Sequence, residues 1–202
     1  MPPFTDTRVT TSECKWRNFY MKATGIVRRI DDLGRIVIPK EIRRTMRIRE
    51  GDPMEIFTSR EGEILLKKYS PVGELGEFAS TLAESMAQAL GALVCVTDRD
   101  YVIATAGAGK KEFEGKLLDE QLQMAIDQRV YRISEKNKKE YLKIIQEESS
   151  EYERQAVATI LSHGESIGAV VVLCKENGIN TDEVLLQVAK TAAGFLGRHM
   201  EQ

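Results

Sequence analysis

Apolar and polar positions follow two different periods along the chain. Between residues 24 and 68, apolar residues come in short β-branched runs separated by turn residues, which is typical of strands. From residue 75 onward, apolar residues also recur at steps of three and four, which is typical of helices buried along one face. The change of pattern predicts two parts with different architectures.

The first part is predicted to begin with a hairpin and a short helix. Residues 24–30 and 35–38 are rich in Val and Ile, and they flank the turn formers of Asp31 to Gly34. Pro39 has no N–H to donate to a sheet but suits the first turn of a helix. We therefore expect a helix from Lys40 to Met46.

Spacing along this helix separates apolar from basic side chains. Ile42 and Met46 are four residues apart, so they are expected to share its buried face. Arg43 and Arg47 fall on another face, with Arg44 beside them. The helix is therefore predicted to be amphipathic and basic on its outer side.

A second hairpin, residues 54–59 and 63–68 around Gly62, completes the order strand, strand, helix, strand, strand. A module of about 49 residues buries little surface and is marginally stable alone. Exchange of hairpins between two copies would cover the open strand edges and roughly double the shared core. An interlocked dimer is therefore expected.

The whole chain is predicted to have an α+β fold in four segments. Residues 1–20 contain Pro2-Pro3 and show neither period, so they are expected to be disordered or foreign to the native protein. Residues 21–70 form the small module, and 71–73 (Pro71-Val72-Gly73) form a joint. Residues 74–202 form a larger body.

The body is predicted to place antiparallel strands between a first and a last helix. The expected elements are a helix at 75–90, a hairpin at 92–96 and 101–105, a helix at 117–129, a hairpin at 156–161 and 167–173, and a helix opened by Thr181-Asp182. Residues 136–153 are interpreted as a solvated charged face or helix, with the alternative that they cover a ligand pocket. The apolar stripes of the first and last helices either pack on their own sheet or join copies in a four-helix bundle, giving a tetramer.

Charge is divided unevenly along the chain. Residues 22–70 hold 12 Lys and Arg against 8 Asp and Glu, a net charge of +4, whereas residues 71–202 hold 14 against 21, a net charge of −7. A basic module beside an acidic body indicates a nucleic-acid partner for the module. The sequence has no apolar run of the roughly 18 residues that a membrane helix needs and no secretory signal, so a cytoplasmic location is expected.

The sequence contains no group of residues at the spacing that catalysis or metal binding needs. Three widely spaced cysteines form neither a disulfide framework nor a CxxC half-site, and Cys95 and Cys174 lie in apolar strands. Residues 107–111 (GAGKK) lack the spacing of a phosphate-binding loop and are interpreted as a flexible basic loop. We therefore expect no catalytic residue, no metal and no cofactor.

The stretch from Met21 to Arg44 contains the pattern D-x-L-G-R-I-V-I-P followed by E-I-R-R. With the tail Ile64 to Tyr69, this module resembles the N-terminal domain of the AbrB family of transition-state regulators. The acidic body is similar to a GAF domain in the order of its elements. The two together resemble a family of sporulation transcription regulators.

The resemblance implies a swapped-hairpin dimer that binds double-stranded DNA at AT-rich or degenerate operators. It implies a nucleoid-associated activator and repressor of sporulation genes, with a GAF-like body that oligomerises; whether this body also senses a small molecule or serves only for oligomerisation is left open. The implied DNA-contacting residues are Arg28, Arg29, Arg35, Arg43 and Arg44. Arg47 and Arg49 are at best auxiliary phosphate contacts.

Two alternatives remain open at this point. The arginines could instead solubilise the surface or pair with Asp31, Asp32 and Glu41. The body could be a redox enzyme similar to the free methionine sulfoxide reductases, which need reactive cysteines in their pocket.

Overall fold

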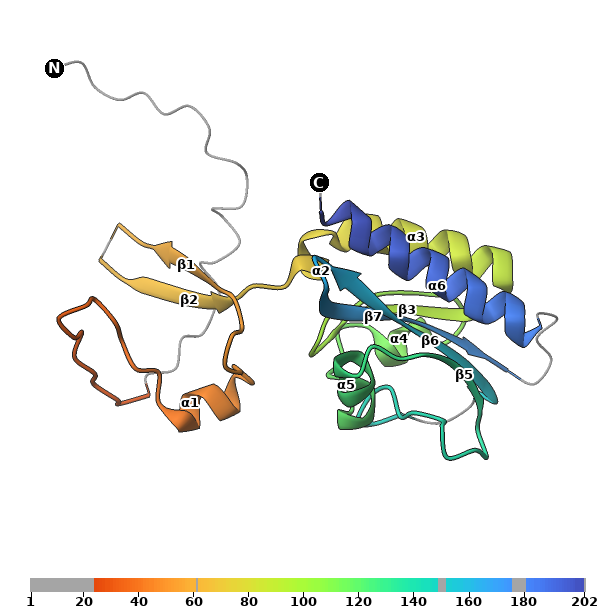
Figure 1. The fold of residues 1–202 in the computed structure, drawn as a ribbon, viewed down its shortest axis with the longest axis horizontal. Coiled ribbons are helices and arrows are strands. Elements are labelled where there is room, and N and C mark those ends of the chain that lie inside the picture. Colours follow the sequence, from red (N-terminus) through yellow and green to blue (C-terminus); the bar gives the residue numbers. More distant parts are fainter. Residues whose placement is uncertain (1–23, 61, 149–151, 176–180, 202) are drawn as a thin grey trace, which may run out of the picture. The chain divides into compact units, whose positions relative to one another are not determined.

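The computed structural model describes residues 24–60, 62–148, 152–175 and 181–201 (Figure 1). The chain divides into two structural units, one ending at Met46 and one beginning at Arg47. The expectation that residues 1–20 are disordered or non-native lies outside the described residues.

The first unit contains the predicted turn and helix. The Asp31 N–H donates to the Arg35 carbonyl at 3.0 Å, and the Gly34 N–H donates to the Asp31 carbonyl at 2.9 Å. Helix α1 (Lys40–Thr45) follows Pro39 and ends one residue earlier than expected.

The two runs that flank this turn form no regular strand within the single chain. Val27 and Val37 are 90% and 72% exposed, and Met46, expected on the buried face of α1, is 60% exposed. An isolated two-stranded hairpin is marginal in water, and the described residues of one chain supply no layer that covers these apolar side chains. The burial expected for Met46 is therefore wrong for the single chain.

The second unit opens with the predicted second hairpin. Strands β1 (Met54–Thr58) and β2 (Ile64–Lys68) pair in antiparallel register from Met54 opposite Lys68 to Thr58 opposite Ile64. The expected joint at 71–73 lies within helix α2 (Pro71–Glu74), where Val72 is buried and the Ser70 hydroxyl accepts from the Gly73 N–H. The boundary of the small module stays a prediction.

The body is built on a five-stranded antiparallel sheet in the order β4-β3-β7-β6-β5. Its strands are β3 (Leu93–Thr97), β4 (Val102–Ala106), β5 (Tyr131–Glu135), β6 (Arg154–Ser162) and β7 (Glu165–Cys174). Four of these match the predicted hairpins. The fifth, β5, escapes prediction because its one buried residue is the polar Ser134 and its apolar residues are exposed or half-buried, which gives a weak apolar pattern.

Helices cover both faces of this sheet (Figure 1). Helices α3 (Gly76–Leu90) and α6 (Asp182–His199) pack on one face with Val94 and Val96, whereas α5 (Glu120–Asp127) and α4 (Lys110–Phe113) pack on the other with Leu93 and Cys95. Because side chains alternate between faces and both faces are covered, every residue of the central strand β3 is buried, and all but Thr97 are apolar.

The ends of the two long helices match the signals in the sequence. Thr181 precedes α6 and its hydroxyl accepts from the Val184 N–H, while Gly91 ends α3 in the left-handed region at φ 61°. No helix formed by the described residues is long and apolar enough to cross a membrane.

Two expectations for the body are corrected. The basic loop of residues 107–111 is ordered into α4 from Lys110 onward, and a Cβ on Gly107 would lie 2.4 Å from the Ala92 carbonyl oxygen. Within the charged stretch, Leu142, Ile144 and Ile145 are buried in the cluster under α5, so this stretch is not simply solvated.

Two glycines of α6 provide a matched test of this packing. A Cβ on Gly197 would lie 2.0 Å from the Leu161 carbonyl oxygen of β6, whereas a Cβ on Gly194 would meet its nearest atom, Nη1 of Arg198, at 3.6 Å. Gly197→Ala is expected to lower the free energy of unfolding by about 1–3 kcal/mol through overpacking. Gly194→Ala is expected to raise it by about 0.5–1 kcal/mol through helix propensity. Denaturant unfolding measures both, and shifts of the same sign would contradict this packing.

Candidate nucleic-acid interface

The five arginines expected to contact DNA all lie in the first unit, and all are exposed. Arg28 and Arg29 precede the Asp31–Gly34 turn, Arg35 follows it, and Arg43 and Arg44 occupy the last turn of α1. The positive charges therefore come from three short segments within one unit of the chain.

Arg35 is held by Asp31. Nε of Arg35 donates to Oδ2 of Asp31 at 2.7 Å, and the Arg35 and Leu33 backbone N–H groups donate to Oδ1 at 2.8 and 3.0 Å. These bonds, the Arg35 backbone bond foremost, lower the pKa of Asp31. Arg35 therefore forms a local ion pair with Asp31 through Nε, as the alternative interpretation of the arginines expected.

The other four arginines make no ion pair with any residue that the structure describes. Large apolar side chains are exposed in the same unit: Ile26, Val27, Ile30, Leu33, Ile36, Val37 and Met46. A single chain thus presents free guanidinium groups beside apolar surface, which is typical of an interaction site rather than a finished monomer surface.

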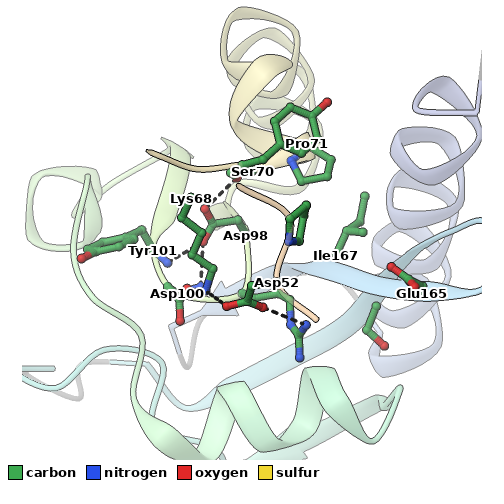
Figure 2. A pocket seen from close by; sticks show the side chains of 13 residues that line it. Asp52, Lys68, Ser70, Pro71, Asp98, Asp100, Tyr101, Glu165 and Ile167 are labelled. Atoms are coloured by element: carbon green, nitrogen blue, oxygen red, sulfur yellow. Dashed lines mark hydrogen bonds and ion pairs between the residues drawn. The ribbon is translucent and has the colours of Figure 1, made fainter. Parts of the chain in front are cut away.

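A second feature, which no sequence pattern predicted, lies where β2 meets the body (Figure 2). The Lys68 ammonium donates to Oδ2 of Asp52, which lies 2.9 Å away, to the Arg47 carbonyl at 3.1 Å, and to Oδ2 of Asp100. An ammonium has three N–H donors, and here each has an acceptor. We call Lys68, Asp52, Asp100 and the Arg47 carbonyl the Lys68 clamp.

Further polar contacts surround the clamp. The Ser70 hydroxyl donates to Oδ2 of Asp98 at 2.8 Å, and the Arg99 guanidinium lies 2.6 Å from Oδ1 of Asp127 and 3.9 Å from Oδ1 of Asp52. Arg49 lies 3.6 Å from Oδ1 of Asp100. Arg49 therefore borders this cluster, and its role as an auxiliary phosphate contact stays a prediction.

The clamp is nearly closed to solvent and borders a hollow of about 160 Å³. The side chains of Asp52 and Asp100 are 2% and 6% exposed, and that of Lys68 is 23% exposed. Burial pushes the pKa of Asp52 upward, but the Arg49 N–H bond and the Lys68 ammonium more than offset it and hold that pKa below its ordinary value.

The sequence carries only a weak signal for the clamp. Asp98-Arg99-Asp100 is a dense group of charges, but such residues are also ordinary in a turn between two strands. Lys68 stands at the end of a strand, where a lysine is usually a solvated edge residue. The pairing of Lys68 with Asp100 joins residues 32 positions apart, and no local period reports such a contact.

The thiols and candidate metal ligands give no reactive site among the described residues. Cys95 and Cys174 are buried, and burial raises the pKa of both thiols, which disfavours the reactive thiolate. No group of three or more His, Cys, Asp or Glu residues in the described ranges is arranged to hold a metal ion.

Comparison with known proteins covers both parts of the chain. Residues 74–201 match the family described as Stage V sporulation protein T C-terminal, transcription factor. Residues 27–74 match the family described as Antidote-toxin recognition MazE, bacterial antitoxin. Stage V sporulation protein T of Bacillus subtilis (strain 168) is 50% identical over 183 residues, which is 90% of this chain and 100% of that protein.

Two further similarities concern the parts separately. Transition state regulatory protein AbrB of Bacillus subtilis (strain 168) is 58% identical over 52 residues, covering 26% of this chain and 53% of that protein. A solved structure of the cyanobacteriochrome receptor PixJ covers 66% of this chain and 99% of its own, with a TM-score of 0.50 and 13% identity. That likeness is one of fold alone, and it agrees with the GAF-like fold expected for the body.

Asp52→Asn tests the clamp by removing one charge while keeping the shape of the side chain. We expect the free energy of unfolding at pH 7 to fall by about 1.5–3 kcal/mol, the usual range for a hydrogen bond to a charged group. The folded-state pKa of Asp52 is lowered, so its charge stabilises the fold above the unfolded pKa of about 3.9 and this contribution is lost as the pH falls through the folded pKa.

Unfolding curves at several pH values measure this effect. The difference in free energy of unfolding between wild type and Asp52→Asn should have its full size at pH 7 and should become smaller below about pH 4. The exposed Asp32→Asn change serves as the control and should alter stability by less than about 0.5 kcal/mol. A difference that does not depend on pH would contradict the ionic role of Asp52.

Proposed function

Because the chain belongs to the stage V sporulation protein T family of transcription factors, we propose that it binds operator DNA through its N-terminal arginines and thereby activates and represses sporulation genes. The observation that carries this proposal is the set of exposed guanidinium groups of Arg28, Arg29, Arg43 and Arg44, which no acidic side chain of the described ranges neutralises. Such a regulator acts in the cytoplasm, associated with the nucleoid.

The binding unit in this proposal is a dimer with exchanged hairpins. The runs at 24–30 and 35–38 pair with no strand among the described residues of one chain, and Ile56, Ile64, Leu65 and Leu66 on β1 and β2 are also exposed. A second copy offers the same unpaired backbone and apolar surface, so mutual pairing satisfies both. Dimerisation also doubles the number of arginines that a single DNA site meets.

Arginine suits both parts of DNA recognition. Its planar guanidinium engages phosphates in a bidentate way and can also bond the edge of a guanine in the major groove. Phosphate contacts set the position on the duplex, whereas groove width and flexibility favour AT-rich or degenerate operators without many base contacts. Arg35, already bonded to Asp31 through Nε, contributes from a fixed position.

Arg43→Ala/Arg44→Ala tests the interface. We expect affinity for an AT-rich duplex to fall roughly uniformly across sequences, because phosphate contacts are lost. In wild type, affinity should fall by about 10³ to 10⁵ between 50 and 200 mM salt if roughly 6–10 phosphates are neutralised, and the double variant should show a shallower slope. Titration at several salt concentrations and genome-wide mapping of bound DNA measure both effects.

The matched control is Lys110→Ala/Lys111→Ala, which removes two adjacent exposed basic residues from the short helix α4 of the body. Its DNA affinity should equal that of wild type. Unchanged genomic occupancy in the arginine variant would remove Arg43 and Arg44 from the interface.

We further propose that the body joins two dimers into a tetramer through α3 and α6. An open groove of about 300 Å³ between these helices is lined by Leu82, Met86, Val188, Ala192 and Phe195 among others, and Phe195 is 44% exposed. The facing surface of a second copy carries the same apolar side chains, so a two-fold contact forms a four-helix bundle. The small-molecule effector expected from the resemblance stays a prediction.

Phe195→Glu tests this assembly by placing a charge in the lining of the groove. Light scattering should give half the wild-type mass for the variant, because a buried unpaired carboxylate opposes the contact. Glu183→Ala, on the exposed first turn of the same helix, should leave the mass unchanged. A wild-type mass for Phe195→Glu would remove this face from the assembly.

The redox-enzyme alternative is not favoured. A reductase of that kind needs an accessible thiolate, whereas Cys95 is fully buried and Cys174 is 3% exposed. Burial raises the pKa of both thiols, so each stays protonated and inert at neutral pH.

A further inference from the structure

We infer that Lys68 couples DNA binding to the β3–β4 turn of the GAF-like body, acting as a positioning residue rather than as a DNA contact. The inference rests on the proposed DNA-binding function. Its basis is that one ammonium group ties together the residues that follow the arginine-bearing helix and the turn at Asp100.

Three segments of the chain meet at Lys68. The Arg47 carbonyl lies two residues after the end of α1, Asp52 lies just before β1, and Asp100 lies in the turn between β3 and β4. The three N–H donors of Lys68 are each committed to one of them. Movement of any one segment therefore changes the bonds to the other two.

On the side of the arginine-bearing helix, Lys68 restrains a strained residue. Arg47 has a φ of 52°, in the left-handed region that a side chain other than glycine rarely adopts. Such a conformation persists only when its surroundings hold it, and the bond from Lys68 to the Arg47 carbonyl is one such restraint. Arg43 and Arg44 lie only four and three residues earlier in the chain, so the segment proposed to contact DNA leads into this strained residue through a short stretch of backbone.

On the side of the body, Lys68 meets a turn that is itself fixed by hydrogen bonds. Oδ1 of Asp98 accepts from the backbone N–H groups of Asp100 and Tyr101 at 2.7 and 2.6 Å. Oδ2 of Asp98 accepts from the Ser70 hydroxyl, two residues after Lys68. The turn is thus bonded to the segment 68–70 at two points, and β3, which leads into this turn, pairs with both β4 and β7.

Neighbouring cations do not duplicate this role. Arg49 reaches Asp100 only at 3.6 Å, and Arg99 reaches Asp52 only at 3.9 Å, whereas Lys68 bonds both carboxylates directly. Because Asp52 and Asp100 are almost completely buried, water does not replace a lost ammonium. Removal of Lys68 therefore breaks the link between the Arg47 carbonyl and Asp100, whereas the bond from Ser70 to Asp98 remains.

Hydrogen exchange of the full-length chain, with and without a saturating AT-rich duplex, tests the coupling. In wild type, DNA should slow exchange of the Asp100 and Tyr101 amides by about fivefold or more, the lower end of ordinary coupling between sites. In Lys68→Met, affinity for the duplex should change by less than about threefold, while the DNA-dependent slowing is lost.

The ratio of exchange rates with and without DNA separates coupling from a purely structural role. A residue that only stabilised the fold would, when replaced, speed exchange with and without DNA alike and leave the ratio unchanged. Lys136→Met is the matched control, because it removes an exposed lysine that pairs with Glu153 at 3.2 Å in the same body, and it should retain the full slowing. If Lys68→Met does not fold, Asp100→Asn is used instead, because it keeps the shape of the side chain. Its ratio of exchange rates with and without DNA is compared with that of wild type in the same way.

The outcomes separate this inference from the function on which it rests. Equal slowing in wild type and in Lys68→Met, or no slowing in a wild type that binds the duplex, would overturn the coupling and leave DNA binding intact. A wild type that does not bind the duplex at all would overturn the proposed function itself.

Discussion

Burial of both faces of the five-stranded sheet is the constraint on which the second unit depends. Each central strand sends alternate side chains to opposite faces, so a sheet covered on one side only would expose half of them to water. Helices α3 and α6 cover one face, and α4, α5 and the buried residues of 142–145 cover the other. The stretch 136–148 is highly charged and has no regular element, yet this constraint draws its apolar residues into the core.

The described residues of the first unit, 24–46, include no such second layer. Its turn closes locally, through bonds between Asp31, Gly34 and Arg35, because those contacts span only a few residues. The apolar runs on either side stay exposed in one chain. Exposed Val and Ile side chains of this kind are typical of an interaction surface, and the same unit bears the exposed arginines that suit nucleic acid.

The Lys68 clamp shows how a buried charge cluster differs from the exposed ion pairs of this protein. The exposed pairs, such as Lys138 with Glu135, are screened by water and contribute little to the stability of the fold. At Lys68 three acceptors converge on one ammonium with little water access, so the arrangement depends on all of its members. That property makes the clamp suited to linking the start of the hairpin β1–β2 with the body.

The sequence by itself determined the local elements, the division of charge and the basic module, but not which side chains meet across long separations. Periods of two and of three to four residues located β1–β4, β6, β7 and the long helices, because these signals act over a few residues. Only the tertiary structure decided that Lys68 meets Asp100, that Gly107 faces the Ala92 carbonyl, and that Leu142 reaches the core from a charged stretch. Such contacts arise from the packing of whole layers. The residues next to a position in the sequence do not indicate which residue of the opposite layer packs against it.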